Sequence, residues 1–293
     1  MATAKGAAKL ERLKNLASTP EAQFEYALGL VEKEANQDVL QAALDVLAES
    51  IDPRARTALL DAYAACSSGH RRDAGCYQRV AIVRALRHLA RRDDAGVLEQ
   101  ALSTYEFLPP GPVEVAAGLR SEALVTLNEV DESLAAYHAV RLLADRHTSL
   151  MSGEPAATAA RVLAAQGQDL PLYAYVLRQE RGISEVLGEC LRGLVALPAS
   201  LLPDVVARYI TGDDEIVLLG LFDLLFSHPH GVTFHDDILE FMRATRLYNI
   251  YRYLATTIVV DRKEDLIAAL RAALPAEPDR IKAEILQEAL DLR

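Results

Sequence analysis

The densest group of potential metal ligands lies in residues 228–237, with the sequence HPHGVTFHDD. Imidazole and carboxylate groups are the ligand types that zinc and iron take in proteins. The residues concerned are His228, His230, His235, Asp236 and Asp237. The segment also suits a loop between two helices, because Pro229 and Gly231 favour a turn and the acidic pair favours the positive end of the next helix. We favour the capped loop and predict no metal or other cofactor.

A cationic stripe follows helical spacing over residues 76–92. Arg84, Arg87 and Arg91 fall on one side of a helical wheel, and an apolar face falls on the other. In an acidic chain, such a stripe suits an acidic partner, a phosphate or a nucleic-acid backbone. The alternative is a solvated face whose arginines pair with glutamates of neighbouring helices.

Tyrosines recur in the second helix of successive predicted helical pairs. Tyr63, Tyr105 and Tyr173 lie on the same helix face when counted from the preceding turn aspartate, whereas Tyr137 points elsewhere. Tyrosine combines rigid contact area with a polar tip, so we select Tyr63, Tyr105 and Tyr173, with the three arginines, as predicted partner-binding residues. Core packing between the helical pairs is the alternative.

The three cysteines give no strong signal for chemistry. Cys66 and Cys76 flank His70, but they form no Cys-x-x-Cys pair, and with Cys190 they make an odd number. We expect free thiols in a cytoplasmic protein. No glycine-rich phosphate loop, Gly-x-Ser-x-Gly elbow or His-Glu-x-x-His helix occurs, so we predict no catalytic residues and no enzymatic activity.

The elements that must position these residues are helical hairpins, and residues 154–179 are the clearest of them. Pro155 suits a first helical turn, Gly167 suits a left-handed C-terminal cap, and Asp169 suits the cap of a second helix. We expect the second helix to bury a stripe of Leu170, Tyr173, Ala174 and Leu177.

The same pattern of helix, turn and helix restarts along the chain, with second helices at intervals of roughly 27 to 42 residues, scattered about the mid-thirties. A break at 108–112, LPPGP, interrupts it, since no helix continues through these prolines. We expect essentially no sheet. The predicted helices span 20–35, 38–50, 52–66, 76–91, 94–107, 113–128, 131–144, 183–196, 200–210, 213–227, 235–244, 247–260, 263–274 and 279–292, besides the pair in 154–179.

Composition sets further limits on the protein class. Hydrophobic residues make up 51% of the 293 residues, but aromatic residues only 6%, so the apolar mass is chiefly alanine, leucine and valine, and we expect mainly helix. A net charge of −11 argues against coating nucleic acid or an anionic membrane. No apolar run is long enough to cross a bilayer, and residues 1–15 do not form a signal peptide. The excess of arginine over lysine indicates a GC-rich, bacterial genome.

The segment EPAATAARVLAAQGQDLPLYAYVL, with weaker copies NQDVLQAALDVLAESIDPRARTALLDAY and RVAIVRALRHLARRDDAGVLEQAL, resembles HEAT and HEAT-like repeats of the armadillo type. The resemblance covers residues 36–275. It implies an all-α, right-handed α-solenoid of about seven hairpins that acts as a scaffold and holds a partner protein on its concave face. The expected parts are an N-terminal cap at 1–35, the repeat array at 36–277 and a capping helix at 278–293.

Two other HEAT-like functions are alternatives. Alkylpurine DNA glycosylases share the repeat architecture, but they grip DNA with a basic concave face and use tryptophan, and this acidic chain has none. A bilin lyase or assembly factor is the other alternative, and no residue positively supports it.

Overall fold

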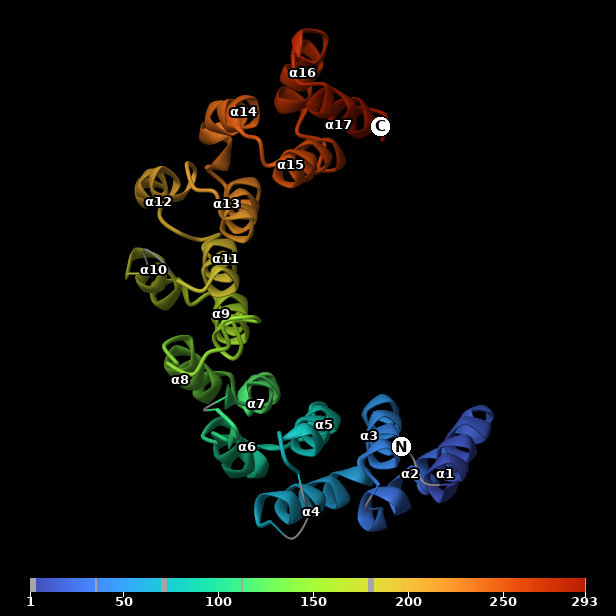
Figure 1. Ribbon diagram of the computed structural model, residues 1–293. Coiled ribbons are helices and arrows are strands. Elements are labelled where there is room, and N and C mark those ends of the chain that lie inside the picture. Colours follow the sequence, from blue (N-terminus) through green and yellow to red (C-terminus); the bar gives the residue numbers. More distant parts are fainter. Residues whose placement is uncertain (1–3, 35, 70–72, 112, 179–181, 293) are drawn as a thin grey trace. The chain divides into compact units, whose positions relative to one another are not determined.

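Residues 4–34, 36–69, 73–111, 113–178 and 182–292 are described by a computed structural model and are almost wholly helical (Figure 1). The chain divides into two compact units, unit 1 at Met1–Val162 and unit 2 at Leu163–Arg293. The dividing point falls inside helix α9 (Ala156–Ala165). The expected all-α class is therefore confirmed for the described residues.

Unit 1 contains the first eight helices, one pair of short strands and the start of α9. Its elements before α9 are α1 (Ala4–Asn15), α2 (Pro20–Lys33), α3 (Gln37–Ser50), α4 (Ala55–Ser67), α5 (Tyr77–Leu86), α6 (Ala95–Leu102), β1 (Phe107–Leu108), β2 (Val113–Glu114), α7 (Ala117–Val130) and α8 (Glu132–Leu143), with 3-10 turns at Leu16–Ser18 and Arg92–Asp94. Helices α3, α5 and α7 pack side by side, and α4 packs on α5 while α6 and α8 pack on α7.

Apolar side chains on the facing sides of these helices form the core of unit 1. Leu44 and Leu47 of α3, Ile82 of α5, and Leu119 and Leu127 of α7 are all fully or almost fully buried. Each helix therefore buries an apolar stripe against its neighbours, as an amphipathic helix must.

Unit 2 is built in the same way. After the end of α9 its helices are α10 (Asp169–Arg178), α11 (Ser184–Gly193), α12 (Leu202–Tyr209), α13 (Glu215–Ser227), α14 (His235–Ala244), α15 (Tyr248–Val260), α16 (Glu264–Ala273) and α17 (Arg280–Leu290), with 3-10 turns at Ala199–Leu201, Gly231–Phe234 and Leu274–Ala276. Helices α11, α13, α15 and α17 pack in sequence, and α10 packs on α11.

Glycines allow α11 and α13 to approach closely. A Cβ atom on Gly220 of α13 would lie 2.3 Å from the backbone oxygen of Gly188 in α11, and a Cβ atom on Gly188 would lie 2.9 Å from the backbone oxygen of Ile216. Real Cβ atoms do not come so near to backbone oxygens. Both positions therefore require glycine at the present helix spacing.

Most predicted helix starts are correct. The Asp131 side chain caps α8 by accepting a hydrogen bond from the Leu134 N–H at 3.0 Å, and Asp279 caps α17 in the same way. Gly167 has the expected positive φ of 66°, between α9 and α10. Helix α3 is capped by Asn36 rather than Asp38, because the Asn36 side chain accepts from the Val39 N–H.

Four local predictions are wrong. The helices expected at 94–107 and 113–128 do not reach Phe107 or Val113, because these residues lie in an antiparallel pair of two-residue strands, the sole sheet in the described part of the chain. The helix expected at 76–91 ends at Leu86. The stripe expected in α10 is also misplaced, since Leu172 and Val176 are buried whereas Leu170 is 81% exposed.

No helix in the described residues combines the length and the apolar character that crossing a membrane requires.

Candidate functional site

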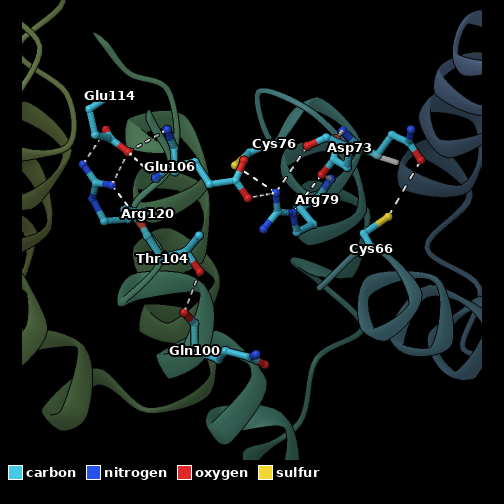
Figure 2. A network of polar contacts seen from close by, with 11 residues as sticks. Cys66, Asp73, Cys76, Arg79, Gln100, Thr104, Glu106, Glu114 and Arg120 are labelled. Carbon is cyan, nitrogen blue, oxygen red and sulfur yellow. Dashed lines mark hydrogen bonds and ion pairs between the residues drawn. The ribbon is translucent and has the colours of Figure 1, made fainter. Parts of the chain in front are cut away.

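The strand pair of unit 1 is held at its open end, away from the turn, by buried arginines from two different helices (Figure 2). We call the described residues 105–111 and 113–115 the hairpin segment. Glu106 precedes β1 and pairs with Arg79 of α5, while Glu114 of β2 pairs with Arg120 of α7. Because the two anchors come from separate helices, the ends of the hairpin segment are fixed in position relative to both.

Arg79 lies in the first turn of α5. Asp73, which precedes this helix, binds both its backbone and the Arg79 side chain. The Asp73 carboxylate accepts hydrogen bonds from the backbone N–H groups of Gln78 at 2.8 Å and Arg79 at 3.1 Å, so it caps the helix. It also accepts from Arg79 Nε at 2.8 Å. Burial opposes the charge on Arg79, but the hydrogen bonds to Asp73 and Glu106 outweigh it and raise the pKa of the guanidinium.

Cys76 is enclosed in this cluster. Its Sγ accepts a hydrogen bond from Arg79 at 3.2 Å, and its side chain is fully buried. Burial raises the pKa of the Cys76 thiol to about 12, although the Arg79 charge acts in the opposite direction. A thiol in this state is a packed core group rather than a nucleophile.

Arg120 is the largest fully buried side chain in the described residues. Its two terminal nitrogens donate to the two Glu114 oxygens at 2.9 Å each, and one of them also donates to the Thr104 carbonyl at 2.9 Å. Arg120 Nε lies 3.3 Å from a carboxylate oxygen of Asp145, which follows α8. The charge is therefore matched by two carboxylates, as a buried charge must be.

The Tyr105 ring covers Arg120, and the rings of His147 and Phe107 continue this aromatic packing. The Tyr105 ring lies 4.2 Å from the Arg120 guanidinium carbon, and its hydroxyl donates to Asp145 at 3.1 Å. His147 packs edge-on against both Tyr105 and Phe107, with ring centroids 5.5 and 5.3 Å apart. Burial and the neighbouring Asp145 charge raise the pKa of Tyr105. These stacked rings join the hairpin segment to the loop that follows α8.

Large apolar side chains are exposed on both of these joined segments. Phe107 is 47% exposed and Val113 is 63% exposed, and in the loop with His147, Leu150 and Met151 are almost fully exposed. Such a concentration is unusual on a soluble surface, and it is typical of sites that contact another molecule. We define the hairpin surface as Tyr105, Phe107, His147, Leu150 and Met151. Val113 is not part of it, because Val113 pairs with Leu108 and therefore lies on the opposite face of the strand pair from Phe107.

The predicted partner-binding residues are placed differently from one another. Tyr105 is part of the hairpin surface, but Tyr63 is only 2% exposed and packs in the core of unit 1, which agrees with the core-packing alternative. Tyr173 is half-buried on α10 of unit 2. The structure therefore does not place the selected tyrosines on one exposed strip within unit 1.

The three arginines do not form one exposed helical stripe, because α5 ends at Leu86 and Arg87 and Arg91 lie beyond it. Arg84 is exposed and donates twice to Glu122 of α7, at 3.0 and 2.8 Å. Arg87 is half-buried, and Arg91 is exposed in the turn before α6. The pairing of Arg84 matches the alternative of a solvated face that pairs with a neighbouring helix.

Residues 228–237, which hold the three clustered histidines, begin with a turn, and His228 has a structural role in it. His228 is buried, its Nε2 donates to the Leu197 carbonyl at 2.8 Å, and its Nδ1 accepts from the His230 N–H at 3.0 Å. Both ring nitrogens are therefore already used. Within the described residues, no three His, Cys, Asp or Glu side chains are grouped closely enough to hold a metal ion. His70, which lies between Cys66 and Cys76 in the sequence, is outside those residues.

Sequence reasoning missed the hairpin segment, although a signal for it was present. The prolines at 108–112 indicated only a helix break, whereas the β-favouring Phe107 and Val113 on either side, next to Glu106 and Glu114, are compatible with a short hairpin.

The comparisons with protein families, curated proteins and solved structures find no match to this chain.

Proposed function

We propose that this chain is a non-enzymatic scaffold that binds a partner protein through the hairpin surface of unit 1. The observation that carries the proposal is the exposure of large apolar side chains on a segment whose ends are anchored by Arg79 and Arg120. A few centrally placed residues, among them aromatic ones, supply most of the binding free energy at protein interfaces. An anchored segment also loses little conformational entropy when it binds.

We further propose that the paired rows of helices belong to a right-handed α-solenoid of the HEAT-like type, with about seven hairpins. The side-by-side packing of α3, α5 and α7, and separately of α11, α13, α15 and α17, supports this assignment. Repeat proteins of this type commonly place binding residues in the loops inserted between their helices. The hairpin segment between α6 and α7 is such an insertion.

Site-specific photocrosslinking tests the function directly. A photoreactive phenylalanine analogue is introduced in place of Phe107 in the full chain, and in place of Val260, an exposed apolar residue at the end of α15, as the control. After irradiation in lysate of the source cell, we expect the Phe107 position to crosslink to one enriched protein that the Val260 position does not capture.

The captured protein is then purified and its affinity measured by calorimetry. We expect Phe107→Ser combined with Met151→Ser to weaken binding by roughly thirtyfold, the effect of losing an interface hot spot. Val260→Ser should change the affinity by less than about twofold. Equal affinities for the native chain and the double variant would refute the proposed surface.

A further inference from the structure

A groove in unit 2 lies between the end of α12 and helix α14, and its lining contains no residue of the hairpin surface. It has a cavity volume of about 490 Å³, within the usual range for ligand pockets. Its walls come from the loop at 210–213, from one side of α14 and from the turn into α15. A second cavity, of about 590 Å³, shares Gly212 and Asp213 with the groove.

The floor of the groove is apolar. Ile210, Phe241, Ala244 and Leu247 contribute to its lining. The Phe241 ring is fixed by packing on the buried Phe222 ring, with centroids 4.9 Å apart. Such a floor can receive an apolar side chain, or the aliphatic stem of an arginine or a lysine.

The polar side chains of the lining carry negative charge. Asp213, Asp237 and Glu240 are all exposed at the groove, and none of them forms an ion pair or a side-chain hydrogen bond within the described residues. Two other acidic residues of unit 2, Asp214 and Asp223, differ in this respect. Asp214 caps α13 by accepting from the Ile216 and Val217 N–H groups, and Asp223 pairs with Arg192.

Helix capping explains only part of this acidic lining. Asp237 lies in the first turn of α14, where the helix dipole favours a negative charge. Glu240 lies beyond that turn and three residues after Asp237, a spacing at which like charges on a helix repel each other. A cation bound in the groove would remove that repulsion.

The charge of the whole unit acts in the same direction. Unit 2 contains 13 arginine and lysine residues against 20 aspartate and glutamate residues, a net charge of −7. A positively charged segment is therefore attracted to this unit before it makes contact. Arg208 is positively charged, but it lines the second cavity and not the groove. Its guanidinium carbon lies 5.9 Å from the centroid of the Tyr209 ring.

We propose that this groove binds a basic segment of a partner protein, in which an arginine or lysine neighbours an apolar side chain. The cation lies against Asp213, Asp237 and Glu240, and the apolar side chain lies on the floor beside Phe241. This inference deepens the proposed scaffold function and rests on it, but it concerns a second surface, which contains no residue of the hairpin surface.

The test uses synthetic peptides as probes of the full chain. An array combines arginine or lysine with leucine, isoleucine or phenylalanine at spacings of up to about four residues. The best binder is labelled with fluorescein and titrated by anisotropy. Two comparison peptides replace its apolar residues with serine or its basic residues with glutamate. We expect the serine peptide to bind roughly tenfold more weakly and the glutamate peptide not to bind.

Matched variants locate the binding site. Asp237→Asn combined with Glu240→Gln should weaken the best peptide by roughly tenfold, since each exposed charge pair contributes a modest amount. The control, Asp204→Asn combined with Asp261→Asn, removes the same charge outside the groove and should change the affinity by less than about twofold. Ala244→Arg fills the groove with a cation and should also abolish binding. Circular dichroism checks that every variant is folded.

Four outcomes would overturn the proposal. They are no binding by any basic and apolar peptide, equal loss in the control variant, competition by spermidine as strong as by the peptide, and self-association that the groove variants abolish. The third outcome would assign the groove to free polyamines, and the fourth to a second copy of the chain. Phe107→Ser should leave peptide binding unchanged, so failure here is distinguishable from failure of the hairpin surface.

Discussion

At the residue scale, Arg120 shows how a charge is accommodated in the core of unit 1. Its side chain is completely buried, and it contacts Glu114, Asp145 and the Tyr105 ring. A buried ion pair adds little stability over apolar packing, but removing one partner leaves the other charge uncompensated in a poorly solvating environment. The arginine is therefore required once its carboxylates are present.

We predict that Arg120→Met lowers the free energy of unfolding by about 3–5 kcal/mol, because Glu114 and Asp145 remain buried without their cation. Urea denaturation followed by circular dichroism measures the change. The matched control is Arg84→Met, which removes an exposed pair with Glu122 and should cost less than about 1 kcal/mol. Equal losses in the two variants would mean that the buried cluster is not coupled to stability.

The Cys76 thiol gives a second residue-scale prediction. Because burial raises its pKa to about 12, its thiolate fraction near neutral pH is roughly a thousandfold below that of a free thiol. In a chain with Cys66→Ala and Cys190→Ala, Cys76 should react slowly with Ellman's reagent when folded and rapidly in urea. Fast reaction of the folded chain would contradict this placement of Cys76.

At the element scale, the close approach of α11 and α13 depends on glycine at Gly188 and Gly220. We predict that Gly220→Ala destabilises the protein by about 1–3 kcal/mol, because the added Cβ atom meets the Gly188 backbone and forces the helices apart. Gly96→Ala is the control, since Gly96 lies in α6 with no heavy atom within 4 Å of the added Cβ.

The control substitution should raise stability by about 0.5–1 kcal/mol, the gain from replacing an unhindered glycine within a helix. Thermal melts of the two variants and the native chain compare the signs of the effects. If both alanine variants proved stabilising, the α11 and α13 backbones would not be as close as described.

Local sequence rules predicted the helices better than the hairpin segment. Aspartate caps such as Asp131 and Asp279, and the positive φ of Gly167, follow from local chemistry, so they could be found in advance. The strand pair depends on ion pairs between Glu106 and Arg79 and between Glu114 and Arg120, which join residues 27 and 6 positions apart. Pairings of this kind are decided by tertiary packing rather than by local propensity.

Helical periodicity also failed where burial depends on a neighbouring helix. In α10 it selected Leu170, which is exposed, and passed over Leu172 and Val176, which are buried. The two stripes differ by about a third of a turn. A helix with apolar residues on several sides does not reveal which side faces α11. The groove beside α14 was equally hidden, because Asp213 and Glu240 are brought to one lining only by the packing of separate elements.

At the scale of the whole molecule, tyrosine ionisation links stability to pH. Burial is the main cause that raises the pKa of Tyr175, Tyr251 and Tyr253 to about 12, from an ordinary value of 10.0. The folded chain therefore keeps these protons at pH values where the unfolded chain loses them. Their contribution to stability is complete below pH 10 and is lost as the pH rises towards about 12.

Tyr251 is almost wholly buried and gives the clearest test of this linkage. Between pH 10 and 12 its ionisation in the unfolded chain should lower the free energy of unfolding by about 1.4 kcal/mol per pH unit. Tyr251→Phe keeps the ring that lies 5.2 Å from Lys282 Nζ but removes the ionisable hydroxyl. Urea denaturation at about pH 9, 10 and 11 should therefore give a shallower alkaline slope for the variant than for the native chain. An unchanged slope would show that the Tyr251 hydroxyl reaches solvent in the folded protein, and it would place the alkaline sensitivity on other groups.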